Sequence, residues 1–159
     1  FPLPIPVLPM SQIKLFLFAV VATFAAATAS AAEPSQLEKN KATVVALYNK
    51  ALNEKDVEGA IALMGPTYKQ HNAGIPDGKE GFRQFFEGFK KRYPNNHSEI
   101  VRVFAEGDYV VLQVHMVNEP GQRGVAVFDL FRLENGKPVE HWDVLQPIPE
   151  SIPHNNTMF

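Results

Sequence analysis

The residues best suited to chemistry in this chain are one histidine and two aspartates that stand among apolar residues near its C-terminal end. Asp129 lies between Val127 and Phe131, and His141 precedes Asp143 by two positions. Alternate side chains of a strand point to the same face, so His141 and Asp143 would share one side and one substrate or proton. Burial raises the pKa of a carboxyl group, and a buried charge is costly unless it is paired. Asp129, His141 and Asp143 are therefore the predicted catalytic residues.

The segment that must position these residues, 125–146, reads as a β-hairpin. Asn135 and Gly136 supply the positive φ angles of a tight turn, and apolar, β-prone runs flank them. This pattern places Asp129 on the same strand face as Val125, Val127, Phe131 and Leu133. It places His141 and Asp143 on the same face of the second strand as Val139 and Leu145. Two alternatives stay open at this point. His141 and Asp143 could form an exposed polar surface opposite a buried Trp142 and Val144, or Asp129 could form a structural ion pair with Arg132 or Lys137.

Six further residues are predicted to contact a substrate. His71 follows Gln70 in a segment read as a loop, where binding groups tend to collect. His115 lies on a strand face with Gln113, although a lone strand histidine is more often a hydrogen-bonded core or surface residue. Four phenylalanines at helical spacing from position 82 to 89 predict core, and some could line a pocket. The complete set of predicted substrate contacts is Tyr48, Gln70, His71, Phe86, His115 and Trp142.

Composition narrows the classes of function. A chain of 159 residues with a net charge of −2 shows no basic patch for nucleic acid. The absence of cysteine excludes disulfides, a thiolate nucleophile and a zinc–cysteine site. A divalent metal held by His71, His115, His141 and the two aspartates is a competing hypothesis, because imidazole and carboxylate are suitable ligands. No HxH or HExxH spacing supports it, so neither a metal nor another cofactor is predicted.

The N-terminal part is predicted to be a leader. Residues 1–9 alternate proline with apolar residues and read as a non-native or upstream segment. Residues 10–31 read as a secretory signal peptide, with an apolar stretch over 15–27 and the small residues Ala-Ser-Ala before the cleavage site. The alternative is an uncleaved membrane anchor over 15–32. We expect a periplasmic or secreted protein without a stable membrane span after cleavage.

Residues 32–159 are predicted to form one α+β domain. A capping box of Ser35 and Glu38 starts a helix that runs to position 53, and Asp56 can cap a second, shorter helix. A third helix spans 79–93. From position 98 the apolar period changes from 3.6 to 2, which predicts strands over 99–105 and 109–118 before the hairpin. Helices followed by antiparallel strands favour helices packed on one face of a curved sheet.

The stretches ALYNKALNEKD, YKQHN, GKEGFRQFF and FRLENGKPVEHWD resemble the SnoaL-like group of the NTF2-like superfamily, over residues 37–146. The closing NNTMF resembles a subgroup named for predicted aldol-condensation activity. The resemblance implies a cone of curved antiparallel sheet around N-terminal helices. In the polyketide cyclases of this group the carboxylate that closes the HxD segment is the acid/base of an aldol ring closure without metal or cofactor, which corresponds to Asp143 beside His141. The cyclases have histidine where this chain has Asp129, and their polar residue after the second helix corresponds to Gln70 or His71.

The resulting prediction is a cofactor-independent acid/base enzyme for a small hydrophobic carbonyl compound. Asp143 would act as acid/base, His141 would orient it or relay its proton, and a protonated Asp129, His71 or His115 would donate to the enolate oxygen. The alternative is a non-catalytic ligand-binding module, which a secretory leader favours. A homodimer is predicted from apolar outer strand faces, assigned to Val110, Leu112, Val114, Met116, Phe128, Leu130, Trp142 and Val144.

Overall fold

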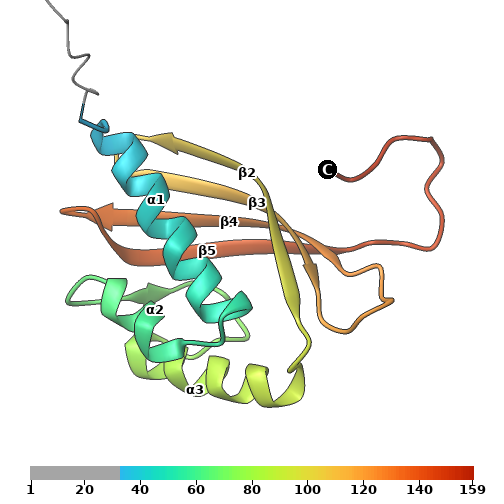
Figure 1. The fold of residues 1–159 in the computed structure, drawn as a ribbon, viewed down its shortest axis with the longest axis horizontal. Helices are drawn as coiled ribbons and strands as arrows, with labels where there is room; N and C mark the ends of the chain where they lie inside the picture. The colour runs from blue at the N-terminus through green and yellow to red at the C-terminus, as the bar shows by residue number, and fades with distance from the viewer. Residues whose placement is uncertain (1–32) are drawn as a thin grey trace, which may run out of the picture. The chain divides into compact units, whose positions relative to one another are not determined.

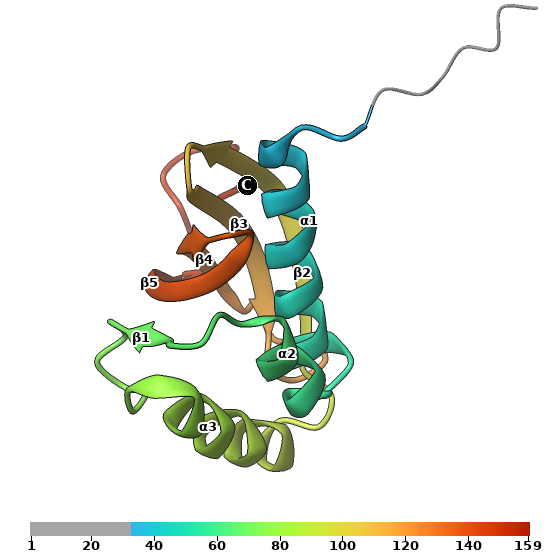
Figure 2. The same ribbon diagram turned by 90° about the vertical axis from the view of Figure 1, so that its left-hand side faces the viewer.

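A computed structural model describes residues 33–159 as three α-helices, one π-helical turn and a five-stranded sheet (Figure 1). The sheet has the order β1-β5-β4-β3-β2, with β1 parallel to β5 and the other neighbours antiparallel. Figure 2 shows α1 along one face of the curved sheet and α3 below its edge. The predicted α+β class is confirmed. The elements are α1 (Gln36–Tyr48), η1 (Asn49–Asn53), α2 (Val57–Leu63), α3 (Gly78–Arg92), β1 (Lys69–Gln70), β2 (His97–Glu106), β3 (Tyr109–Val117), β4 (Val125–Glu134) and β5 (Lys137–Pro147).

The predicted leader lies outside the described residues. Within residues 33–159, no helix has both the length and the apolar character needed to cross a bilayer.

The helix starts follow the capping residues read from the sequence. Ser35 Oγ accepts from the backbone N–H of Glu38 at 3.3 Å, and Asp56 Oδ1 accepts from the backbone N–H of Gly59 at 2.8 Å. The first predicted helix changes at Asn49 into the π-helical turn η1. The Asn53 side chain fixes that turn to the sheet, because its amide exchanges two hydrogen bonds of 2.9 Å with the backbone of Ser98 on β2.

The hairpin of β4 and β5 forms as predicted. Asn135 and Gly136 have φ angles of 52° and 74°, which a tight turn between right-twisted strands requires. Asp129 and His141 point inward and are buried, so the alternative of an exposed polar face does not apply to His141. The inward-facing side chains become more exposed to solvent toward the end of β5, where Leu145 is 45% exposed.

Strand β3 shows the reverse of the predicted facing. Val110, Leu112 and Val114 are fully buried on the helix-covered face, and Leu112 pairs directly with Asp129. His115 therefore lies on the outer face. The alternation of β3 agrees with the structure, because Gln113 and His115 share the outer face with Tyr109 while the buried face is entirely apolar. The prediction was wrong because it placed His115 on the substrate side and left the apolar face for a partner. The core therefore takes side chains that had been assigned to a partner interface.

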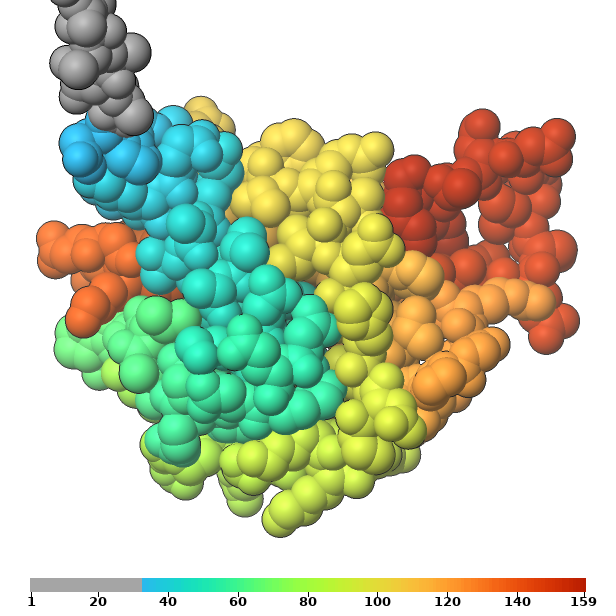
Figure 3. Space-filling view, in the orientation of Figure 1, coloured from blue at the N-terminus to red at the C-terminus, as the bar shows by residue number. Residues whose placement is uncertain are grey.

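The outer face of the sheet keeps some exposed apolar side chains, and the C-terminal segment returns to this face at β3. Phe128 and Val144 are 46% and 68% exposed. The Phe159 ring lies 4.7 Å from the His115 ring, and the Gln113 amide donates to the Met158 carbonyl at 3.5 Å. Figure 3 shows α1 and α2 covering the opposite face, with the C-terminal segment projecting to the right. Homodimerisation through the outer face stays a prediction.

Candidate active site

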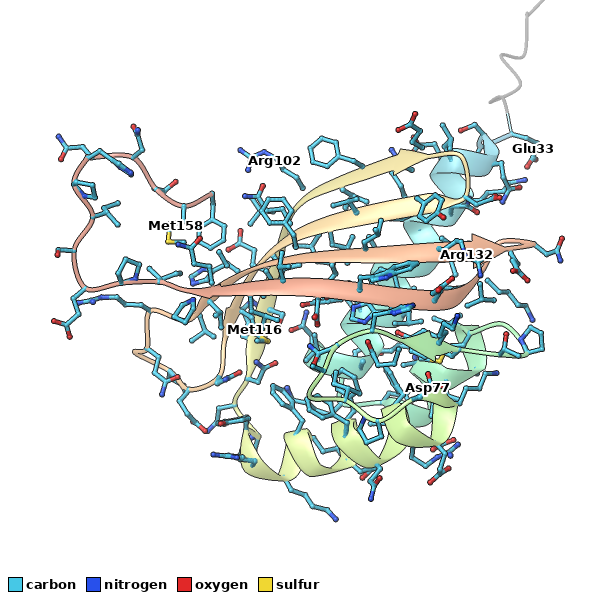
Figure 4. All side chains as sticks on the ribbon, turned by 180° about the vertical axis from the view of Figure 1, so that it is seen from behind. Glu33, Asp77, Arg102, Met116, Arg132 and Met158 are labelled. Atoms are coloured by element: carbon cyan, nitrogen blue, oxygen red, sulfur yellow. The ribbon has the colours of Figure 1, made fainter. Side chains whose placement is uncertain are left out.

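A cavity of about 100 Å³ lies between α3, the end of α1 and the inward face of β4 and β5. Met116, labelled in Figure 4, lines it from β3. Its aromatic walls come from Tyr48, Tyr68, Phe82, Phe85, Phe86, Phe89 and Phe131. Its polar groups come from Gln70, Asn72, Asp129, His141 and Asp143. The cavity therefore combines a mostly apolar wall with a few convergent polar groups, which is typical of a small-molecule site.

The centre of the polar region is a buried pair formed across two strands. His141 Nε2 lies 3.0 Å from Asp129 Oδ1, and the two side chains are only 8% and 6% exposed. Burial raises the pKa of Asp129, and the hydrogen bond from His141 opposes part of that shift. Asp129 Oδ2 is buried and, among the described residues, has no hydrogen-bond partner. His141 therefore holds this carboxyl group through one oxygen, and the other oxygen is shielded from solvent.

The hydrogen bonds of Gln70 determine where His141 carries a hydrogen. Gln70 Oε1 accepts from the backbone N–H of Asn72 at 2.8 Å and lies 2.9 Å from His141 Nδ1. A backbone N–H can only donate, so the oxygen of the Gln70 amide must face both groups. An amide oxygen only accepts, and His141 Nδ1 must therefore be protonated. It follows that one further proton lies between His141 Nε2 and Asp129 Oδ1.

Both nitrogens of His141 are thus occupied by protein groups. The expected partnership with Asp143 is not formed, because His141 pairs with Asp129 and Gln70 instead. In the register of β4 and β5, His141 lies opposite Phe131 and Asp129 lies opposite Asp143, so His141 and Asp129 are diagonal neighbours. Diagonal positions on neighbouring strands are close enough for ring side chains to bridge. Neither nitrogen of His141 is therefore left to contact a ligand directly. The alternative ion pair of Asp129 with Arg132 is also absent, since Arg132 pairs with glutamates.

Asp143 has different surroundings from Asp129, although the two are directly opposite in register. Asn72 Nδ2 lies 2.7 Å from each Asp143 carboxylate oxygen, and Asp143 is only partly buried. Asn72 Oδ1 in turn accepts from the backbone N–H of Gly74 at 2.7 Å, which fixes the orientation of the amide. Asp143 therefore faces the cavity with a neutral donor beside it and no ion-pair partner among the described residues.

Tyr48 adds a hydroxyl group to the buried end. It is the last residue of α1, just before the π-helical turn, and its side chain faces Asp129. Burial raises the pKa of Tyr48 well above its ordinary value, and the neighbouring Asp129 raises it further. The phenol group consequently stays protonated and can donate a hydrogen bond at neutral pH.

Three predicted substrate contacts lie away from the cavity. His71 Nε2 donates to Glu140 Oε1 at 2.8 Å, and its ring stacks on Trp142 with centroids 4.6 Å apart. His115 Nε2 donates to the Arg123 carbonyl at 2.7 Å on the outer face. Neither histidine can therefore serve as the donor to an enolate in this cavity, and Trp142 does not line it.

The other predicted contacts, Tyr48, Gln70 and Phe86, do line the cavity. Asn72 lines it as well but was not predicted. Its contact with Asp143 depends on the two-residue strand β1, which pairs in parallel with β5. The segment TYKQHN has no alternating pattern that predicts this strand pairing. Its amide side chains, Gln70 and Asn72, could still have indicated a group of binding residues.

The three central side chains also form a possible cation site. Asp129, His141 and Asp143 each offer one ligand atom, and these atoms lie within 4.8 Å of one another. His71 and His115, which the metal hypothesis had included, lie elsewhere. A cation here would have to displace the proton shared by His141 and Asp129, because metal ligands must be deprotonated.

Comparisons with known proteins agree with this architecture. A crystal structure described as an uncharacterized cystatin-fold protein from Novosphingobium aromaticivorans is 25% identical, with a TM-score of 0.59 over 66% of this chain and 97% of that one. A candidate polyketide cyclase from Bacillus cereus is 23% identical, with a TM-score of 0.60 over 70% of this chain and 78% of that one. A candidate ketosteroid isomerase from Kribbella flavida is 14% identical, with a TM-score of 0.61 over 76% and 87% of the two chains.

Among curated protein sequences, none matches this chain. The model of the SnoaL-like domain matches residues 44–141, which include Tyr48, Gln70, Asn72, Asp129 and His141. The fold and the family model agree, and this chain belongs to the SnoaL-like domain family.

Proposed function

We propose that this protein is a cofactor-independent acid/base enzyme that acts on a small hydrophobic carbonyl compound. The observation that carries the proposal is the pair of carboxyl groups that face one apolar cavity from neighbouring strands in different surroundings. Asp129 is buried and shares a proton with His141, whereas Asp143 has only a neutral amide beside it. Carboxyl groups whose surroundings differ in this way can take separate acid and base roles.

In the proposed reaction, the Asp143 carboxylate removes a proton from the carbon next to the carbonyl group of the ligand. The electron pair moves to the carbonyl oxygen and gives an enolate. The Tyr48 hydroxyl, which lines the cavity, would donate to that oxygen, while the proton between His141 Nε2 and Asp129 Oδ1 keeps the buried pair neutral overall. Return of the proton from Asp143 to a different carbon gives an isomer. Attack of the enolate on a second carbonyl carbon forms a carbon–carbon bond and an alkoxide, and the alkoxide takes the proton from Asp143 to give an aldol.

The names of two structural neighbours support this class of reaction, since one is described as a polyketide cyclase and another as a ketosteroid isomerase. A second candidate function is ligand binding without turnover. The contact between Asn72 and both oxygens of Asp143 favours it, because the Asn72 amide occupies the oxygens that a general base would use. For the proposed enzyme, Asn72 must release at least one of these oxygens when the ligand enters.

The proposal is tested by α-proton exchange of cyclohexanone in D2O, followed by ¹H NMR. We expect the wild-type protein to accelerate exchange and Asp143→Asn to lose about 100-fold or more of that rate. His71→Ala is the matched control, because His71 lies outside the cavity, and it should keep the wild-type rate. An unchanged rate in a folded Asp143→Asn protein would reject Asp143 as the base.

Two further outcomes separate the competing functions. A wild-type protein that binds the ketone without exchanging its protons would be a ligand-binding module. Exchange that disappears with EDTA and returns with a divalent metal would favour the cation site at Asp129, His141 and Asp143.

We also propose that the mature protein is periplasmic or secreted and forms a homodimer. The first part rests on the signal-peptide pattern of residues 10–31, and N-terminal sequencing of the protein from the producing cell tests it. The second rests on the exposed Phe128 and Val144 of the outer sheet face. A monomer by light scattering would reject the dimer.

A further inference from the structure

The walls of the cavity restrict the charge of its ligand. Among the residues that the structure describes, no lysine or arginine lines the cavity. The nearby cations of α3 are engaged elsewhere, with Arg83 bound to Glu58 and Lys90 bound to Glu87. The polar region holds two carboxyl groups instead. An anionic ligand would lose its hydration without gaining a counter-charge, which is costly in an apolar site.

The same walls restrict the size of the ligand. A cavity of roughly 150 Å³ lined by apolar side chains is known to accommodate benzene. The cavity of this protein measures about 100 Å³, so its enclosed part holds no more than one ring. Multi-ring compounds would require the walls to move.

The wall that sets this limit is a set of aromatic rings on α3. Phe86 packs on Phe82 with centroids 4.3 Å apart and meets Phe85 edge-on at 5.1 Å. Rings packed in this way have few alternative rotamers, because each one blocks its neighbours. Phe82 is buried in the core, whereas Phe85 is only partly buried. Truncating Phe85 or Phe86 would therefore enlarge the cavity without removing the centre of the core.

From these observations we propose that the cavity selects an uncharged carbonyl compound no larger than a single six-membered ring, with the size limit set by Phe85 and Phe86. The carbonyl group rests on the proposed function, whereas the limits on charge and size follow from the walls alone.

A titration followed by ¹H–¹⁵N NMR tests the proposal with three probes. Cyclohexanone is neutral and has one ring, cyclohexanecarboxylate has one ring and a charge, and 1-tetralone is neutral with two rings. We expect cyclohexanone to shift the amide signals of the cavity residues and the other two probes to bind at least tenfold more weakly. Equal binding of the carboxylate would overturn the charge limit, and equal binding of 1-tetralone would overturn the size limit.

Variants of the cavity wall test whether Phe85 and Phe86 set the size limit. Phe86→Ala should admit 1-tetralone. If Phe86→Ala does not fold, Phe85→Ala provides the same test at a residue that is not packed against the buried core cluster. Phe104→Ala, on the exposed side of β2, is the matched control and should leave all three affinities unchanged, because Phe104 is 57% exposed. Failure of both cavity variants to admit the larger ketone would show that another part of the protein sets the limit.

The experiments distinguish a failure of the charge and size limits from a failure of the proposed enzymatic function. Cyclohexanone that binds without α-proton exchange supports this inference and rejects catalysis. Proton exchange on 1-tetralone together with exclusion of cyclohexanone supports catalysis and overturns this inference.

Discussion

Two histidine–carboxylate pairs lie on opposite faces of the sheet. Their nitrogen–oxygen distances are similar, but one pair is buried and the other is partly exposed. On the inward face, His141 lies 3.0 Å from Asp129 with side chains 8% and 6% exposed. On the far side of β5, His71 lies 2.8 Å from Glu140 with side chains 35% and 13% exposed. Burial raises the pKa of Asp129, whereas hydrogen bonds from His71 and Arg132 lower the pKa of Glu140. The comparison shows that desolvation, and not the presence of a histidine, decides which carboxyl group holds a proton.

The neighbours of each pair support the same distinction. Glu140 also has Arg132 at 2.8 Å and Lys69 at 3.9 Å, so its charge is balanced by several cations. Asp129 has a single basic partner and a free buried oxygen. The outer pair is therefore a structural ion cluster, whereas the inner pair is the one that we propose as part of the reactive site.

Removing each histidine should separate the two pairs most strongly. His141→Ala leaves a buried carboxyl group without its partner, and we expect the free energy of unfolding at pH 7 to fall by about 3 kcal/mol. His71→Ala removes a partly exposed interaction, and the loss should be below about 1 kcal/mol. Urea denaturation of both variants measures the difference, and equal losses would contradict the contrast.

The pH dependence of stability gives the next largest effect. Asp129 has a higher pKa in the folded protein than in the unfolded chain, so the folded state binds more protons. The stability that Asp129 contributes is complete below the unfolded pKa of about 3.9 and is lost as the pH rises through the folded pKa. The loss is about 1.4 kcal/mol for each unit by which the folded and unfolded pKa values differ. Asp129→Asn should lack this loss. Parallel stability curves of the two proteins from pH 4 to pH 9 would contradict the raised pKa.

Gln70→Leu tests the protonation of His141. The variant removes the acceptor of the Nδ1 hydrogen, and we expect a loss of about 1 kcal/mol in stability. In the wild-type protein, ¹⁵N NMR should show a protonated His141 Nδ1, and this preference should weaken in the variant. The signals of His71 should not change. An unprotonated Nδ1 in the wild-type protein would contradict the assignment.

Glu140→Gln should give the smallest effect, with the opposite sign to that of Asp129→Asn. The pKa of Glu140 is lowered by folding, so its contribution is present above the unfolded pKa and is lost as the pH falls through the folded pKa. The stability of the variant should not fall in this way at acid pH. Added salt should reduce the difference in stability between the wild-type protein and the variant. Urea midpoints between pH 3 and pH 6 at two salt concentrations measure it, and a difference that grows with salt would contradict the ion cluster.

Local sequence signals predicted much of the fold. The turn at Asn135 and Gly136 and the caps at Ser35 and Asp56 depend on a few adjacent residues, and each is present in the structure. The inward position of Asp129 also followed from strand alternation. These features could be predicted because their physical causes lie within a few residues of one another.

The pairing within the site could not be predicted in the same way. The parallel contact of β1 with β5 brings Gln70 to His141 and Asn72 to Asp143 over 71 residues in each case. Such contacts depend on tertiary packing, which a local pattern does not encode. The predicted facing of β3 was wrong for a different reason. Its apolar face, with Val110, Leu112 and Val114, was assigned to a partner, although the polar Gln113 and His115 mark the other face as the outer one.

The most direct test of this account is the titration of the Asp129 carboxyl group by ¹³C NMR, with Asp129→Asn used to assign its signal. The raised pKa of Asp129 predicts a transition above the ordinary aspartate value of about 3.9, because burial stabilises the protonated form. A transition at or below that value would show an ordinary ionised carboxylate bound to a charged His141. Asp129 would then have no proton to share, and the proposed division of roles between the two aspartates would fail.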